Sequence, residues 1–180
     1  MQYEVLCAGF GGQGVLYLGD LIAQAALNQG LHVTYLPTYG VAMRGGTANC
    51  MVTIADGEIG SPLLDHPHAA IILNQPSFDK YQPLLRKGGL AVVNATLVKP
   101  DSPVRGEDVN VVWTPATQVS REITGNDRAA NMVALGAFLR AQKVLAPESV
   151  EALLRTNGSP KKQEILQKNL AAFRAGLDLK

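Results

Sequence analysis

The chain has 180 residues, of which 47% are hydrophobic and 17% are charged, and its formal net charge at pH 7 is +1. A charged fraction below the usual value of about 25% favours burial of part of the surface in a complex. The small net charge argues against nucleic-acid binding, which needs a clustered basic face. At this length we expect a single domain spanning residues 1–180.

The first third of the chain predicts a βαβ unit. Residues 3–8 form a short apolar run with the length of a buried strand. After several glycines, Val15, Leu18 and Ile22 recur with helical spacing. Gly30 is placed to end that helix as a left-handed cap, and residues 32–36 read as a second strand. A strand, a glycine turn, a helix and a strand in this order predict a right-handed βαβ unit.

The middle of the chain departs from simple alternation. Residues 38–46 lack periodicity and predict an ordered loop, whereas residues 47–55 alternate between polar and apolar side chains. Asp56-Gly57 then predicts a β-hairpin with residues 58–62. Further strands are expected at residues 69–73, 90–93 and 109–113, and a short helix at residues 77–86.

The last third predicts helices. Asp127 is expected to cap the first, Pro147 to begin the second and Ser159-Pro160 to begin the third. In this last helix we expect Ile165, Leu166, Leu170 and Phe173 to face inward. The predicted fold class is therefore α/β: a Rossmann-like sheet flanked by helices, with a β-hairpin excursion after the second strand.

Residues 9–14, GFGGQG, lie between the first strand and its helix. Glycines there permit a tight turn and let a phosphate approach backbone N–H groups at the positive end of the helix. An NAD site would also need an acidic residue after the second strand, but residues 34–39 contain none, which disfavours NAD. The alternative interpretation is that these glycines only allow close packing.

Arg44-Gly45-Gly46 lies in the loop after the second strand. A guanidinium beside flexible backbone suits a phosphate or carboxylate, and in a βαβ fold this loop reaches the same edge of the sheet as residues 9–14. The alternative is a solvated arginine in a turn. His66 and His68 have no third ligand placed by the sequence, so we predict no metal site. No nucleophile motif is present, and we expect no catalytic residue in this chain.

The two cysteines, Cys7 and Cys50, are far apart and form no pair motif. They predict no disulfide framework, and they are too few to hold an iron–sulfur cluster. The N-terminal residues lack the pattern of a signal peptide, and no apolar run has the roughly 18 residues of a membrane span. We therefore expect a cytoplasmic protein that does not enter a membrane.

Several blocks of the sequence closely resemble the gamma subunit of 2-oxoacid:ferredoxin oxidoreductases. The segment RGGTANC together with EIGSP is most similar to the 2-oxoglutarate and branched-chain 2-oxoacid types, and the indolepyruvate enzyme is related. The resemblance covers nearly the whole chain. Its blocks are residues 9–26, GFGGQGVLYLGDLIAQAA; residues 39–62, YGVAMRGGTANCMVTIADGEIGSP; residues 74–94, NQPSFDKYQPLLRKGGLAVVN; and residues 131–138, NMVALGAF.

The resemblance implies a division of labour. Enzymes of this family decarboxylate a 2-oxoacid on thiamine diphosphate, reduce ferredoxin through iron–sulfur clusters and transfer the acyl group to coenzyme A. Thiamine diphosphate and the clusters would lie on partner subunits, one thiamine-binding and one ferredoxin-like. The gamma subunit would support assembly and contribute to the coenzyme A pocket. A homodimer is one possible state of the isolated chain. Two alternatives stay open: a freestanding nucleotide- or flavin-binding protein, and a purely structural assembly subunit.

The resemblance also suggests cofactor contacts. Some relatives place a lysine after the second strand to meet the coenzyme's phosphates, whereas residues 36–39 here contain none, so Arg44 is the substitute. Asn131 could contact the ligand or serve as a helix cap, and both interpretations stay open. The predicted contacts are Gly9, Phe10, Gly11, Gly12, Gln13, Gly14, Thr38, Arg44, Gly45 and Asn131.

Overall fold

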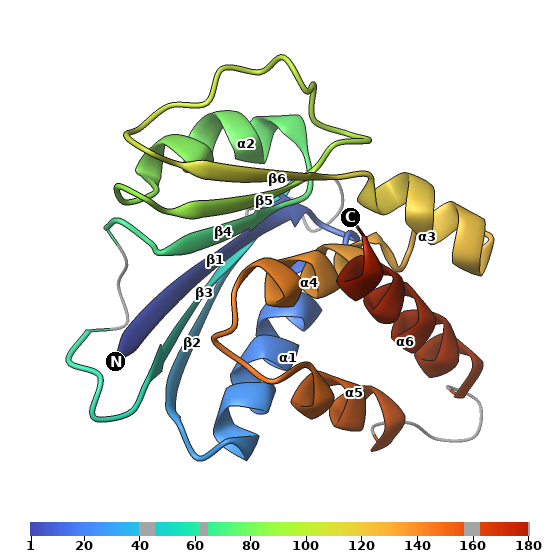
Figure 1. Ribbon diagram of the computed structural model, residues 1–180, viewed down its shortest axis with the longest axis horizontal. Helices are drawn as coiled ribbons and strands as arrows, with labels where there is room; N and C mark the ends of the chain where they lie inside the picture. The colour runs from blue at the N-terminus through green and yellow to red at the C-terminus, as the bar shows by residue number, and fades with distance from the viewer. Residues whose placement is uncertain (40–45, 62–64, 157–162, 180) are drawn as a thin grey trace.

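The computed structural model describes residues 1–39, 46–61, 65–156 and 163–179. They form a six-stranded sheet in the order β2-β3-β1-β4-β5-β6, flanked by helices (Figure 1). The strands are β1 Gln2–Phe10, β2 His32–Tyr39, β3 Thr47–Ala55, β4 Ala69–Ile72, β5 Leu90–Asn94 and β6 Asn110–Thr114. The helices are α1 Val15–Asn28, α2 Gln75–Tyr81, the 3-10 helix η1 Gln82–Leu84, α3 Ala116–Thr124, α4 Ala130–Ala141, α5 Pro147–Thr156 and α6 Gln163–Asp178. The predicted α/β fold is confirmed.

The sheet is mixed. Strands β1, β4, β5 and β6 run parallel, whereas β3 is antiparallel to both β1 and β2. Strands β1 and β2 therefore point the same way, but β3 lies between them. The hairpin predicted at Asp56-Gly57 is wrong, because residues 56–61 contain no strand and are largely exposed. Instead, β3 pairs antiparallel with β2, the strand that precedes it in the sequence. Residues 40–45, which connect these two strands, lie outside the described ranges.

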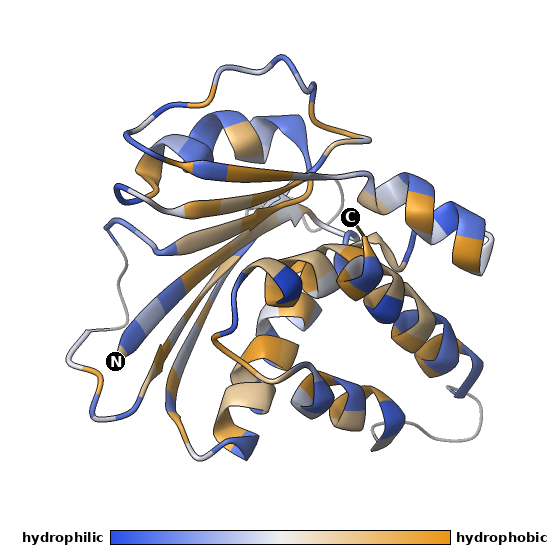
Figure 2. Cartoon of the chain, viewed as in Figure 1, coloured by the Kyte–Doolittle hydropathy of each residue, from blue (hydrophilic) through white to orange (hydrophobic). Residues whose placement is uncertain are grey.

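The alternating side chains of the strands build two cores. On one face, Val5 and Cys7 of β1 and Val52 of β3 belong to a core built with α1 and α4, on which α5 and α6 pack from outside. On the other face, Leu6 and Ile72 pack with Phe78 of α2. Every residue of β4 and β5 is buried, because these strands are covered on both faces. Figure 2 shows the hydrophobic residues along these central strands.

The helical part of the sequence prediction needs four changes. Helix α3 was not predicted, and Asp127 does not cap α4, which begins after Ala129. The predicted helix at residues 77–86 begins earlier and tightens into η1 where Pro83 lies. In α6, Phe173 is buried as predicted, but the Ile165 side chain faces solvent.

Pro147 begins α5 as predicted, whereas Ser159-Pro160 lies outside the described residues. Gly30, with φ of 75°, follows α1 as the predicted left-handed residue. Within the described part of the chain, the helices are all too short or too polar to cross a membrane.

Candidate functional site

The glycine loop, residues 9–14, connects β1 to α1 at the carboxyl end of β1. Gly12 and Gly14 have positive φ values of 97° and 71°, which glycine adopts without steric cost. The Gln13 N–H donates to the Phe10 carbonyl at 3.1 Å and closes the turn. The Gly11 N–H donates to the Gly46 carbonyl at 2.9 Å. The glycine loop and the end of the loop after β2 therefore meet at one edge of the sheet, as the sequence predicted.

The Gln13 side chain braces this loop against the end of β4. Its Oε1 accepts from the Phe10 N–H at 2.7 Å and from Asn74 Nδ2 at 3.0 Å. Its Nε2 donates to the Leu73 carbonyl at 3.3 Å. A Cβ at Gly9 would lie 2.7 Å from Gln13 Oε1, so this glycine makes room for the brace. The hydrogen-bonding capacity of Gln13 is thus largely used within the chain.

Asn131, in the first turn of α4, holds the other end of the loop. Its side chain is buried; Nδ2 donates to the Gly14 carbonyl at 3.2 Å and Oδ1 accepts from the Met132 N–H at 3.0 Å. A Cβ at Gly14 would collide with the amide nitrogen of Asn131. This geometry makes Asn131 a support for the glycine loop.

A cavity of about 160 Å³ opens beside the loop. It lies next to β1 and β4, whose following helices, α1 and α2, cover opposite faces of the sheet (Figure 1). Ligands of open α/β sheets bind in the crevice at such a switch point. Among the described residues, no atom lies within 4 Å of a Cβ built on Gly12, so none of them covers this backbone. The lining residues are Gly12, Gln13, Leu73, Leu97, Thr117, Asp127, Arg128 and Ala130.

The charges around the cavity favour binding of an anion near Arg128. Arg128 is exposed and makes no ion pair within the described residues, while Asp127 pairs with Arg121 at 3.5 Å. The first turn of α1 contains no acidic residue, and its N-cap, Gly14, contributes no side-chain hydrogen bond. The N-terminal N–H groups of α1 and the Arg128 guanidinium are therefore the groups at this edge suited to bind a phosphate.

The N-terminus of α3 lies at the same edge of the sheet, but side chains of the protein itself already accept hydrogen bonds from its N–H groups. Asn94 Oδ1 accepts from the Thr117 N–H at 3.2 Å, and Thr96 Oγ1 accepts from the Gln118 N–H at 3.2 Å. Asn94 Nδ2 donates to Thr117 Oγ1 at 2.8 Å and to the Leu73 carbonyl at 3.3 Å. The Leu73 carbonyl also accepts from Gln13, so side-chain amides link the glycine loop to α3.

The structure places some of the predicted contact residues beside the cavity, and their role in binding a cofactor stays a prediction. The glycine loop lines or borders the cavity, whereas Arg44 and Gly45 lie outside the described residues. Thr38 is exposed near the end of β2. Sequence reasoning missed Arg128, because α3 was not predicted and the turn before α4 was interpreted only as a cap. Its position three residues before the family block at residues 131–138 was the available signal.

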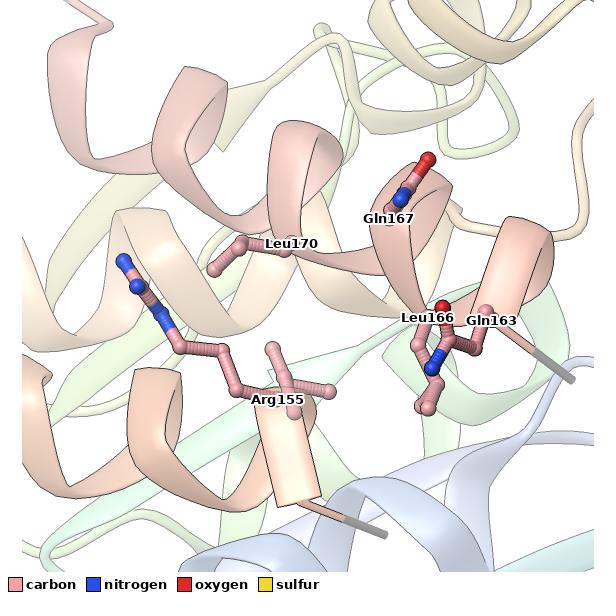
Figure 3. A pocket seen from close by; sticks show the side chains of 6 residues that line it. Arg155, Gln163, Leu166, Gln167 and Leu170 are labelled. Atoms are coloured by element: carbon pink, nitrogen blue, oxygen red, sulfur yellow. The ribbon is translucent and has the colours of Figure 1, made fainter. Parts of the chain in front are cut away.

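Other hollows lack comparable chemistry. A groove of about 180 Å³ between α5 and α6 is lined mainly by leucines and glutamines (Figure 3). A wider hollow of about 530 Å³ lies where α4 leads into α5. Neither is lined by the glycine loop. Among the described residues, no group of three or more His, Cys, Asp or Glu side chains could hold a metal ion.

Comparison with known proteins identifies the family. Residues 4–179 match the family described as pyruvate ferredoxin/flavodoxin oxidoreductase. The ketoisovalerate oxidoreductase subunit VorA of Methanothermobacter thermautotrophicus is 35% identical over 98% of this chain and 36% of VorA. The 2-oxoglutarate synthase subunit KorC of the same organism is 32% identical over 99% of this chain and 95% of KorC.

Two solved structures share the fold. The gamma subunit of keto/oxoacid ferredoxin oxidoreductase from Geobacter sulfurreducens has a TM-score of 0.81 at 27% identity, over 98% of this chain and 96% of that chain. The second is the 2-oxoglutarate:ferredoxin oxidoreductase from Magnetococcus marinus with 2-oxoglutarate, coenzyme A and succinyl-CoA bound. Its TM-score is 0.87 at 25% identity, over 98% of this chain and 30% of that chain. The chain thus spans about a third of VorA and nearly all of KorC. It belongs to the pyruvate ferredoxin/flavodoxin oxidoreductase family.

Proposed function

We propose that the chain is the gamma subunit of a 2-oxoacid:ferredoxin oxidoreductase that oxidises 2-oxoglutarate or a branched-chain 2-oxoacid. KorC, which this chain matches over nearly its full length, supports the subunit assignment. Thiamine diphosphate and the iron–sulfur clusters would lie on thiamine-binding and ferredoxin-like partner subunits. The cysteine content supports this division, since Cys7 and Cys50 are both buried and cannot ligate a cluster alone. The proposed location is the cytoplasm.

Within that complex, the chain would hold the phosphates of coenzyme A at the glycine loop. The observation that supports this is the cavity lined by Gly12 and Gln13, which lead into α1, and by the exposed Arg128. Bound coenzyme A supplies the thiol that accepts the acyl group. A cavity of about 160 Å³ suits only part of this ligand, since complete ligand sites usually measure about 300–1,000 Å³. The rest of the coenzyme would extend toward a partner subunit.

The residues of this chain would act by binding and orientation. The backbone N–H groups at Gly12 and in the first turn of α1, together with Arg128, would fix the phosphates, while Gln13 and Asn131 keep the loop in shape. Phe10, Thr38, Arg44 and Gly45 remain proposed contacts from the family resemblance.

A second candidate is a purely structural assembly role. The internal hydrogen bonds of Gln13 and Asn131 favour it, because both side chains are engaged by the chain itself.

Arg128→Ala and Gly12→Asn distinguish these roles in the assembled enzyme. Asparagine tolerates positive φ better than most residues, and its side chain would project into the open space at Gly12. We expect each variant to raise the KM for coenzyme A about tenfold and to leave the KM for the 2-oxoacid unchanged. Arg128→Ala would do so by removing a charge-assisted contact, and Gly12→Asn by obstructing the phosphate.

Arg140→Ala is the matched control, because Arg140 is another exposed arginine and lines a different hollow. Size-exclusion chromatography would establish that each variant assembles. Assembled Arg128→Ala and Gly12→Asn enzymes with an unchanged KM for coenzyme A would favour the structural role. Flavin co-purifying with the isolated chain would instead support the freestanding alternative.

A further inference from the structure

The turn between α3 and α4 presents Arg128 to the glycine-loop cavity. This turn is short and begins with Gly125, which has φ of 79° and ends α3. Asn126 Oδ1 accepts from the Arg128 N–H at 3.0 Å. The Asp127 carbonyl accepts from the Ala130 N–H at 3.2 Å, which leads the chain into α4. The backbone that carries Arg128 is therefore tied within its own turn.

The side chain of Ser120 in α3 forms hydrogen bonds to both ends of this turn. Its side chain is fully buried; Oγ donates to the Asn126 carbonyl at 2.8 Å and accepts from the Ala129 N–H at 3.2 Å. The two contacts lie on either side of residues 127–128. The hydroxyl of Thr124 lies 3.0 Å from the Asn126 carbonyl and 2.9 Å from the Ser120 carbonyl. One buried hydroxyl thus fixes both ends of the segment that bears Arg128.

We propose that Ser120 is a positioning residue that orders the α3–α4 turn so that Arg128 faces the phosphate-binding end of the cavity. An exposed arginine on a mobile turn would lose conformational freedom each time it bound an anion, and this would weaken binding. A turn held in advance by buried hydrogen bonds avoids that loss. The inference rests on the proposed role of the cavity in binding coenzyme A.

A double-mutant cycle in the assembled enzyme tests the inference. Ser120→Ala alone is expected to raise the KM for coenzyme A about three- to tenfold with kcat at saturating coenzyme unchanged, since one or two hydrogen bonds to the turn are lost. In an Arg128→Ala background, Ser120→Ala should change this KM less than twofold, because there is no guanidinium left to position. Thr124→Val, which removes the neighbouring hydroxyl, should act in the same direction and more weakly.

Ser77→Ala is the matched control. The Ser77 hydroxyl is also buried, but it has no hydrogen-bond partner within the described residues. This control should leave the KM for coenzyme A unchanged. Two outcomes would overturn the positioning role. In the first, Ser120→Ala changes the KM for coenzyme A equally with and without Arg128. In the second, Arg128→Ala raises this KM but neither Ser120→Ala nor Thr124→Val changes it. If Arg128→Ala itself has no effect, the proposed coenzyme site fails instead.

If Ser120→Ala does not assemble, the same cycle is run with Thr124→Val. A change in KM that persists without Arg128 would then overturn the inference.

Discussion

At the scale of single residues, His68 is held between two opposite charges. Its Nδ1 lies 3.3 Å from Glu4 Oε2, and the Arg86 guanidinium contacts its Nε2. Burial lowers the pKa of His68 below its ordinary value of 6.5, and the nearby Arg86 lowers it further, while Glu4 opposes both effects. The folded protein therefore favours the neutral imidazole, whose Nε2 can accept a hydrogen bond from Arg86.

The pKa shift of His68 predicts a pH-dependent stability. The unfolded state takes up the proton first, so the contribution is complete above about pH 6.5 and is lost as the pH falls through the folded pKa. We expect the free energy of unfolding, measured with urea, to fall as the pH is lowered below about 6.5. His68→Gln should reduce this dependence, whereas His66→Gln, at an exposed ring, should retain it. Parallel pH profiles for the wild type and His68→Gln would contradict the assignment.

The sequence identified the glycines of the loop but not the residues that require them. Gly9 makes room for Gln13, and Gly14 makes room for Asn131. The Asn131 contact joins residues 117 positions apart, so no local pattern contains it. Arg128 was missed for the same reason, because its turn faces the loop only once α3 and α4 are in place. Motif spacing can locate a glycine loop between a strand and a helix, but the charged residues beside the loop depend on tertiary packing.

At the scale of elements, α4 and α6 touch backbone to backbone. A Cβ at Gly136 would collide with the Phe173 carbonyl oxygen, and a Cβ at Gly176 would collide with the Val133 carbonyl oxygen. Sequence periodicity predicted helices in this region and the burial of Phe173. It did not predict this crossing, because the pattern of large apolar residues carries no information on where two helix backbones approach.

The crossing predicts a large effect of a small substitution. Gly136→Ala should destabilise the fold, because overpacking costs about 1–3 kcal/mol. Alanine's higher helix propensity, worth about 1 kcal/mol, would offset only part of this. Gly57→Ala is the control, since a Cβ there meets no atom of the described residues within 4 Å. Thermal unfolding should show a lower Tm for Gly136→Ala and little change for Gly57→Ala. An unchanged Tm for Gly136→Ala would mean that the helices can separate at no cost.

The strand order of the sheet was also only partly predictable from the sequence. The apolar runs predicted the buried strands β4 and β5, whose residues pack on both faces. They could not predict that β3 pairs with both β1 and β2, because Asp56-Gly57 is a strong local turn signal. The residues after Gly57 are too exposed to form a strand that a sheet would stabilise. Long-range pairing of β3 outweighed the local signal.

At the scale of the whole molecule, the exposed apolar side chains come from many elements. The largest exposures are those of Met1 at 62%, Ile165 at 59% and Leu27 at 57%. These residues belong to the N-terminus, α6 and α1. Because they are scattered singly, they mark no docking patch, and the charged fraction of 17% is the feature that favours burial of part of the surface in a complex. The self-association of the isolated chain stays a prediction.

The same features predict that the chain depends on its partners for activity. The proposed coenzyme A site at its cavity would hold only part of that ligand, and its two cysteines are too few to hold a cluster. We expect the isolated chain to contain no iron or thiamine diphosphate and to oxidise no 2-oxoacid. Mixing it with the other subunits, prepared without this chain, should restore ferredoxin reduction that depends on both 2-oxoacid and coenzyme A. Arg128→Ala should restore it only at higher coenzyme A concentration. An isolated chain that carries a stoichiometric cluster, or partner subunits fully active without it, would contradict this dependence.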